Sequence, residues 1–321
     1  MSVILAGIDE AGLGPILGPL CFGWSAFAVP NADLDLWAAL DDAVSRQPSN
    51  DAEHLVVADS KRVFTRNARG RRRLESTALC ALAVRREADG VPTDAGAFFD
   101  GALGPSRECL GAHPWYTALP DALPLWTDRG RLELRAAKLA RALEGAGVEL
   151  LDAGARAVPA GELNRSFAAT RNKSTTVGDF LMQVLRYLWR RCNGHELVLV
   201  VDRQGGRAHY GPYLARGLDG ARVSLVEEDE RRSEYLLQRE RGSARVVFVQ
   251  KADDGSFPVA LASCLAKYTR ELAMEAFNRW FEERTPGLKP TAGYATDGRR
   301  WLNEVGRGLD GVDRDLLVRE R

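Results

Sequence analysis

Four acidic residues of this chain stand directly after apolar stretches, where carboxylates could gather. They are Asp9 and Glu10 after the run 3–8, Asp202 after the run 196–201, and Asp253 after the run 245–249. In open α/β sheets, the loops after strand ends bring distant residues together. Converging carboxylates repel one another unless cations neutralise them, and Mg²⁺ prefers such oxygen ligands. The pattern therefore predicts a site for two divalent ions, which could stabilise the attacking and leaving oxygens of a phosphoryl displacement.

A more ordinary role is open to each of these acids. Asp and Glu at strand ends often form turns or cap helices, and for a single residue that role is the commoner one. Neighbouring residues of a regular strand also point to opposite faces, so Asp9 and Glu10 share a site only if the chain bends. Gly12 and Gly14 permit such a bend. From the residue pattern alone, both interpretations stay open.

The stretches around these acids predict alternating strands and helices. The predicted strands are 3–8, 20–29, 196–201 and 245–249, with the first two antiparallel, and the predicted helices are 34–44, 71–84, 177–191 and 259–280. Residues 89–127 are rich in Gly and Pro and have weak periodicity, which predicts a loop-rich segment. Strands that alternate with helices are typical of an α/β protein with a central sheet.

Charge and cysteine usage narrow the class of protein. Lys plus Arg equals Asp plus Glu, at 44 each, so the chain lacks the net positive charge of many nucleic-acid-binding proteins. A neutral total can still conceal a basic face, because the segment 61–73 holds seven cations and no acid. The five cysteines show no metal-binding spacing, which argues against structural zinc and for a reducing compartment. With no signal-like N-terminus and no long apolar run, we expect a cytoplasmic protein without a membrane span.

Several ordered segments resemble those of one known family. They are Gly7-Ile8-Asp9-Glu10-Ala11-Gly12-Leu13-Gly14-Pro15 with Gly18-Pro19, Asp59-Ser60-Lys61, the strand-end Asp202, Lys251-Ala252-Asp253 with Ala262-Ser263, Ala266-Lys267 and Arg270, and Gly293-Tyr294-Ala295-Thr296. On these segments the chain is identified as a divergent member of the type 2 ribonucleases H, or ribonuclease HII. The resemblance covers about 5–30, 55–76, 172–207 and 250–300, and the stretch 85–170 matches no segment of the family.

The resemblance implies a ribonuclease H-like fold, with a mixed central sheet flanked by helices. It also implies two-metal hydrolysis of the RNA strand of RNA–DNA hybrids, leaving 3′-hydroxyl and 5′-phosphate ends. The implied metal carboxylates are Asp9, Glu10, Asp202 and Asp253, which would hold two Mg²⁺ or Mn²⁺ ions when substrate is bound. The implied substrate contacts are Gly12, Leu13 and Gly14 at the ribose, Ser60, Lys61 and Lys267 on the nucleic acid, and Tyr294 against a sugar.

Two departures from the family pattern bear on the substrate. Leu13 stands where the family has a cation, and Arg299 stands where it usually has a histidine. A nuclease of the same fold with another nucleic-acid substrate is therefore an alternative, and a catalytically idle nucleic-acid-binding homologue is a second. Retention of all four acids counts against the idle homologue, because a binding module gains nothing from mutually repelling carboxylates.

The resemblance also suggests how the chain is organised. We expect a catalytic domain over 1–285, with an insertion at about 85–170, and a C-terminal helical extension over 286–321. The expected partner is an RNA–DNA hybrid or ribonucleotide-containing DNA, the expected cofactor is Mg²⁺ or Mn²⁺, and the expected state is a monomer.

Overall fold

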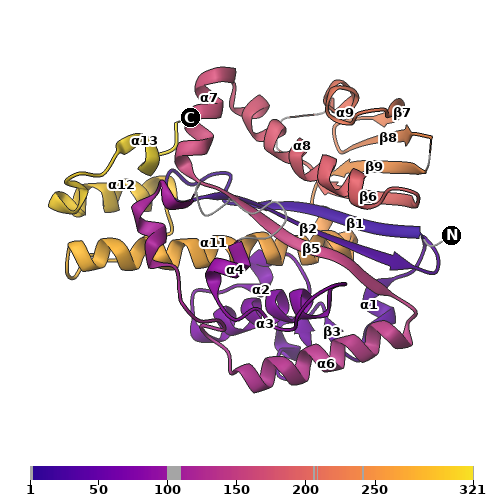
Figure 1. Ribbon diagram of the computed structural model, residues 1–321, viewed down its shortest axis with the longest axis horizontal. Coiled ribbons are helices and arrows are strands. Elements are labelled where there is room, and N and C mark those ends of the chain that lie inside the picture. Colours follow the sequence, from indigo (N-terminus) through magenta and orange to yellow (C-terminus); the bar gives the residue numbers. More distant parts are fainter. Residues whose placement is uncertain (1–2, 100–109, 205–206, 208, 241, 321) are drawn as a thin grey trace.

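A mixed β-sheet forms the centre of the computed structural model, which describes residues 3–99, 110–204, 207, 209–240 and 242–320 (Figure 1). Its seven strands lie in the order β5-β2-β1-β6-β9-β8-β7. Their bounds are β1 (Val3–Ala11), β2 (Leu20–Val29), β5 (Glu149–Val158), β6 (Glu196–Asp202), β7 (Arg222–Glu228), β8 (Arg232–Gln238) and β9 (Ser243–Val249). The predicted α/β class with a mixed central sheet is confirmed.

The three middle strands of the sheet run in the same direction. β1 pairs with β6 in parallel up to Ile8 and Val201, and β6 pairs with β9 in parallel up to Asp202 and Val249. The outer strands β2 and β8 are antiparallel to their inner neighbours, as predicted for β2. The carboxyl ends of β1, β6 and β9 therefore lie side by side at one edge of the sheet.

Helices cover both faces of this sheet (Figure 1). The α-helices of the described residues are α1 (Leu36–Ala39), α2 (Ser60–Val63), α3 (Ala68–Val84), α4 (Ala95–Phe99), α6 (Arg129–Gly145), α7 (Ala160–Thr170), α8 (Lys173–Arg191), α9 (Gly211–Gly217), α10 (Ala252–Gly255), α11 (Phe257–Arg284), α12 (Ala295–Glu304) and α13 (Arg314–Leu317). Short 3₁₀ turns lie at Pro48–Asn50, Pro114–Ala118 and Gly306–Leu309. A separate pair of short strands is formed by β3 (Val44–Ser45) and β4 (Leu55–Val56). One apolar core lies between the sheet and α11, and the other lies between the sheet and α8. None of the helices in the described ranges has the length and apolar character of a membrane span.

The long helix α11 lies directly on the backbone of two strands. A Cβ atom added to Gly7 of β1 would sit 2.2 Å from the backbone nitrogen of Val259, and one added to Gly23 of β2 would sit 2.0 Å from the carbonyl oxygen of Ala262. A side chain at either position would push the helix away, because real Cβ atoms do not approach backbone so closely. The two glycines thus bring the first turns of α11 close to the strand ends.

The structure differs from the predicted elements in two regions. The predicted helix 34–44 is only the single turn α1, Leu36–Ala39. The Asp35 side chain caps its start by accepting hydrogen bonds from two backbone N–H groups, and Leu40 follows its end. The segment 85–170, which resembles nothing in the family, contributes β5 to the edge of the main sheet and α6, which packs against α3. The proposed division at residue 285 falls just after the end of α11 and stays a prediction.

A buried carboxylate ties the unmatched segment to the helices beneath the sheet. Glu75 of α3 is 0% exposed, and it accepts hydrogen bonds from the backbone N–H groups of Leu125 (2.7 Å) and Trp126 (2.8 Å) and from the Tyr268 hydroxyl (3.1 Å). Burial raises the pKa of Glu75 above its ordinary value. The hydrogen bonds to both carboxylate oxygens lower this pKa and so offset part of the effect of burial.

We expect Glu75→Gln to lower the free energy of unfolding by about 1–3 kcal/mol, because the new amide would turn its own N–H groups toward a backbone donor. Chemical denaturation measures this difference. The exposed Glu133→Gln change on α6 is the control, and its effect should stay below about 0.5 kcal/mol. Equal stability of the Glu75 variant and the wild type would contradict the anchoring role.

Candidate active site

The acidic pair Asp9–Glu10 lies inside the first strand, and the prediction that it follows the strand is wrong. β1 continues to Ala11 because it stays paired with β2, with Glu10 opposite Phe22. Pairing with β6, in contrast, stops at Ile8 and Val201. Asp9 is thus the first residue of β1 beyond its ladder with β6, next to the strand end that carries Asp202.

Asp253 reaches the same edge of the sheet on a short helix. After β9 the chain turns at Lys251, whose φ of 55° is left-handed, and enters α10 with Asp253 in its first turn. The Asp202 carboxylate accepts a hydrogen bond of 2.9 Å from the backbone N–H of Ala252. Asp202 therefore fixes the turn that presents Asp253.

The carboxylate at the centre of this group is strongly perturbed. Asp9 is 7% exposed, and burial, followed by the charge of Asp202, raises its pKa to about 8. Hydrogen bonds with Ser263 and from the Glu10 N–H (2.7 Å to Oδ1) act in the opposite direction. Burial raises the pKa of Glu10 well above its ordinary value too, and the charges of Asp9 and Asp202 add to the effect. The pKa values of Asp9 and Glu10 are thus raised by the same two causes, burial and the charge of Asp202.

The other two acids belong to the same group. Burial, then the charges of Asp59 and Asp202, raises the pKa of Asp253 to about 6. Burial also raises the pKa of Asp202, while the Ala252 N–H and the charge of Lys61 lower it. The structure therefore groups Asp9, Asp202 and Asp253, and the charges of Asp9 and Asp202 also reach Glu10.

Two residues of the site were not among the predicted metal ligands or substrate contacts. Asp59 begins α2 by accepting a hydrogen bond of 2.9 Å from the Lys61 N–H, and its charge acts on Asp202 and Asp253. Ser263, in the second turn of α11, lowers the pKa of Asp9 through a side-chain hydrogen bond, and its Oγ lies 3.0 Å from the Ser60 Oγ. Both residues lie in segments that resemble the family, and this resemblance is the sequence signal that could have identified them.

The predicted substrate contacts fall into two groups. Lys61 is exposed and its charge lowers the pKa of Glu10, Asp202 and Asp253, so it faces the acids, with the buried Ser60 beside it. Lys267 instead pairs with Glu271 of its own helix, at 2.6 Å between Nζ and Oε1, and lies above the ring of Phe64. Tyr294 stands at the start of α12 with 48% of its surface exposed.

The Gly-rich turn after β1 is held in shape by two buried arginines. Arg270 of α11 donates to the carbonyls of Pro19, Leu17 (3.2 Å) and Ala292 (2.9 Å). Arg319 donates to the carbonyls of Gly18 (2.7 Å), Gly12 and Pro15 (3.3 Å), and its neighbour Val318 forms a β-bridge with Leu17. Gly12 has a φ of 87°, which favours glycine. The C-terminal segment thus fixes the turn where ribose contacts are predicted.

Arg319→Ala is expected to loosen this turn at a small net cost in stability. Carbonyl oxygens that lose a buried donor cost about 1–3 kcal/mol, but removal of a buried charge offsets part of this loss. Burial and the nearby Arg270 already lower the pKa of Arg319 to about 9. We expect faster amide hydrogen exchange over residues 12–18 and a loss of about 1 kcal/mol. The exposed Arg314→Ala change should alter neither, and unchanged exchange in the Arg319 variant would contradict this role.

The donor types at this edge of the sheet fit hard divalent cations. The four acids offer carboxylate oxygens, the ligands of Mg²⁺ and Mn²⁺, and their burial beside one another is a charge arrangement that a divalent ion would offset. Within the described ranges, no three His, Cys, Asp or Glu side chains already stand at metal-ligand spacing. The chemistry of the donor set, carboxylate oxygens without His or Cys, fits these ions.

Comparison with known proteins gives one family match. The family model described as ribonuclease HII matches residues 218–307, a segment that contains Asp253, Lys267 and Tyr294. No curated protein matches the chain.

Several solved structures are similar at low identity. Ribonuclease HII of Archaeoglobus fulgidus, solved with PCNA, is 17% identical, over 99% of this chain and 94% of that one, with a TM-score of 0.44. Ribonuclease H2 of Pyrococcus horikoshii is 16% identical, over 98% and 92%, with a TM-score of 0.46. A Bst ribonuclease HIII in complex with Mn²⁺ is 16% identical, over 99% and 66%, with a TM-score of 0.45. The family match over residues 218–307 confirms the predicted resemblance to the ribonuclease HII family.

Proposed function

We propose that this protein is a divalent-metal-dependent endonuclease that hydrolyses the RNA strand of RNA–DNA hybrids to 3′-hydroxyl and 5′-phosphate ends. The proposal rests on the position of Asp9, Glu10, Asp202 and Asp253 near the ends of adjacent parallel strands. Each of these acids raises the pKa of another one or has its own pKa raised by another. The ribonuclease HII match, which includes Asp253, supports the same reaction class. We place the activity in the cytoplasm and expect the protein to act as a monomer.

In this proposal the four acids hold Mg²⁺ or Mn²⁺, and two ions bind when substrate is present. The ions supply Lewis-acid stabilisation of charge on the attacking and leaving oxygens during phosphodiester hydrolysis. The chain contributes orientation: the Ala252 N–H fixes Asp202, while the Glu10 N–H and Ser263 fix Asp9. Such fixed ligands reduce the reorganisation that the reaction requires.

The nucleic acid would be positioned by the groups on either side of the acids. Lys61 and Ser60, at the start of α2, are suited to a phosphate of the cleaved strand. Gly14 is exposed, and a Cβ atom added there would meet open space, so a ribose could approach the backbone of the turn closely. The 2′-hydroxyl is the group that distinguishes RNA from DNA at such a contact.

The environment of Leu13 favours the second candidate, the same chemistry on a different hybrid or junction. Leu13 is half-buried and lines a small cavity beside the apolar side chains Leu163, Phe167 and Val177 of α7 and α8. The same cavity is also bordered by Lys173, Arg319 and Glu320. An apolar contact with the helices above the sheet thus replaces the cation of the family. A substrate that needs a cation at this position would bind less well.

The substrate is tested with three labelled duplexes in Mg²⁺ or Mn²⁺: a long RNA–DNA hybrid, DNA with a single embedded ribonucleotide, and plain DNA. The leading proposal predicts cleavage of the long hybrid and none of plain DNA. Preference for another duplex would favour the second candidate. Tight binding of the hybrid without cleavage of any duplex would instead identify an idle binding homologue and overturn the proposal.

A further inference from the structure

A second charged site lies beneath the sheet, between α3 and α6. It is a pocket of about 280 Å³ that also borders the turn at residues 51–52. Its charged lining consists of Arg69, Arg72 and Arg73 from α3, Arg131 and Arg135 from α6, and Asp51. Five arginines against one carboxylate leave an excess of four positive charges around one small volume.

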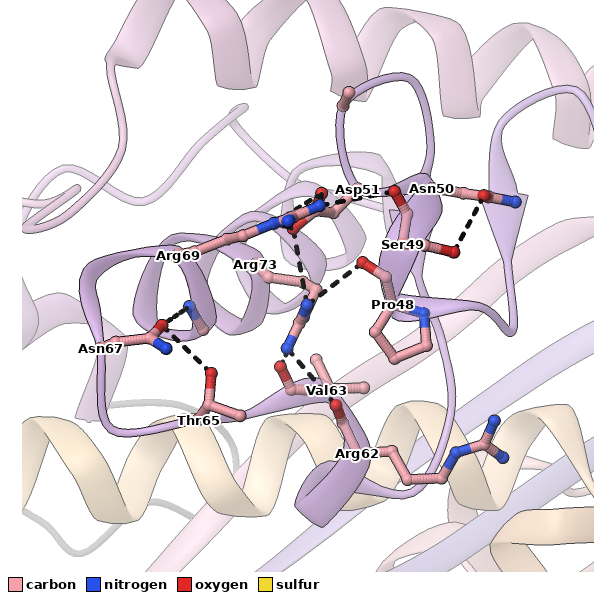
Figure 2. Close-up of polar contacts among 12 residues, drawn as sticks. Pro48, Ser49, Asn50, Asp51, Arg62, Val63, Thr65, Asn67, Arg69 and Arg73 are labelled. Atoms are coloured by element: carbon pink, nitrogen blue, oxygen red, sulfur yellow. Dashed lines mark hydrogen bonds and ion pairs between the residues drawn. The ribbon is translucent and has the colours of Figure 1, made fainter.

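The single carboxylate is already committed to two of these arginines (Figure 2). Arg69 binds Asp51 through both Nε (2.9 Å) and Nη2 (2.7 Å), and Nη1 of Arg73 lies 3.5 Å from the same group. Asp51 cannot also neutralise the rest of the lining. Burial lowers the pKa of Arg73, as expected for a cation whose charge is incompletely compensated.

The arginines of α6 bond to neutral groups. Arg131 donates to the carbonyl of Ala52 at 3.3 Å, and Arg135 donates to the same carbonyl at 2.9 Å and to that of Asp51. Carbonyl oxygens satisfy N–H donors without removing the charge, and burial and the nearby Arg131 lower the pKa of Arg135. Arg72, on α3, lines the same pocket and is exposed. Arg72 and Arg131 are thus placed to receive an anion.

We propose that this pocket binds a phosphate group, with Arg72 and Arg131 as its direct contacts and Arg135 behind them. Guanidinium groups match the tetrahedral oxygens of phosphate through paired N–H donors, and several of them around one anion favour phosphate over a single carboxylate. The inference adds a binding site outside the acidic cluster and does not depend on cleavage. Two of the five arginines come from α6, which belongs to the segment that resembles nothing in the family.

The pocket is connected to the acidic site through one arginine. Arg73 donates to the carbonyl of Val63 (2.5 Å) and to that of Arg62 (3.4 Å), at the end of the short helix that begins with Ser60 and Lys61 (Figure 2). A phosphate in the pocket would lie against the residue that holds this helix in place. The phosphate could belong to the backbone of a nucleic acid that continues past the acids or to a free phosphate compound, and the test separates these sources.

The test measures binding by the full chain in EDTA, so that hydrolysis does not enter. Fluorescence anisotropy follows a labelled RNA–DNA hybrid, and calorimetry follows pyrophosphate. We expect Arg72→Glu and Arg131→Glu each to weaken binding by roughly tenfold and to reduce the salt dependence of hybrid binding by about one phosphate contact. Arg141→Glu is the matched control, because Arg141 is an exposed arginine of α6 outside the pocket.

Each outcome decides for or against the pocket. Loss of hybrid affinity in both pocket variants, but not in the control, supports a nucleic-acid backbone, and loss of pyrophosphate binding alone supports a free phosphate compound. Unchanged binding of both ligands overturns the proposal. Arg72→Gln and Arg131→Gln replace the glutamate variants if thermal unfolding shows those to be misfolded. Arginine-dependent binding without any cleavage in Mg²⁺ would overturn the proposed nuclease and leave the pocket standing.

Discussion

Replacement of Asp9 by asparagine is expected to reduce the rate of hybrid cleavage by on the order of 10³-fold or more. Asp9 is the most buried of the four acids and the one whose pKa rises to about 8 beside Asp202. An amide of the same shape keeps the packing but removes the negative charge that would hold a divalent ion. Single-turnover cleavage of the long hybrid in Mg²⁺ measures the loss without interference from product release.

The same change is expected to stabilise the metal-free protein. A carboxylate buried against another carboxylate opposes folding, and asparagine removes that repulsion. We expect a rise in melting temperature of about 2–4 °C in EDTA, which corresponds to about 1 kcal/mol. Loss of activity with gain of stability distinguishes a functional acid from a structural one. The exposed Asp179→Asn change in α8 should affect neither quantity, and a fall in melting temperature of the Asp9 variant would contradict the account.

Gly23→Ala is expected to destabilise the protein more than Glu75→Gln or Arg319→Ala. A methyl group at this position would sit 2.0 Å from the Ala262 carbonyl oxygen and 2.9 Å from the backbone nitrogen of Ala266, so the helix α11 itself must move. Overpacking of this kind costs about 1–3 kcal/mol, and contact with rigid backbone places this change at the upper end. The shift would also displace Ser263 from Asp9, so activity should fall together with stability.

Gly145→Ala is the control for this prediction. Gly145 ends α6, and a Cβ atom added there meets nothing within 4 Å. Alanine favours helix over glycine, so the control should be neutral or stabilising by up to about 1 kcal/mol. Chemical denaturation of the two variants provides the comparison. If the Gly23 variant were as stable as the control, α11 could not lie on the strand backbone as described.

The strands and helices with strong apolar periodicity could be predicted from the sequence. β2, β6, β9, α8 and α11 agree with their predicted spans within a few residues, because each buries a continuous face. β7 was missed because most of its side chains are exposed, and the neighbouring acids resemble a solvated loop. β5 and α6 were missed because the segment 85–170 was interpreted as loop-rich in its first part and matched no known pattern.

Of the residues in the candidate site, only the acids could be predicted from local sequence patterns. Asp202 and Asp253 follow apolar strands, and that local pattern suffices to group them, although Asp9 and Glu10 proved to lie inside their strand. Arg319 could not be found in this way, because its contacts with Gly12 and Gly18 join residues about 300 positions apart. The pocket between α3 and α6 escaped for the same reason, since neither helix alone shows how its arginines face one another. The Arg319 contacts and the arginine pocket both arise from tertiary packing, which leaves no local pattern in the sequence.

In the proposed function, carboxylates from β1, β6 and α10 support metal-dependent hydrolysis of RNA paired with DNA. The most direct measurement is cleavage of an end-labelled RNA–DNA hybrid by wild type, Asp9→Asn and Asp202→Asn, each with Mg²⁺, with Mn²⁺ and with EDTA. The account predicts 3′-hydroxyl and 5′-phosphate products from the wild type with either ion, none in EDTA, and almost none from the variants. Cleavage that persists in either variant, or in EDTA, would contradict it.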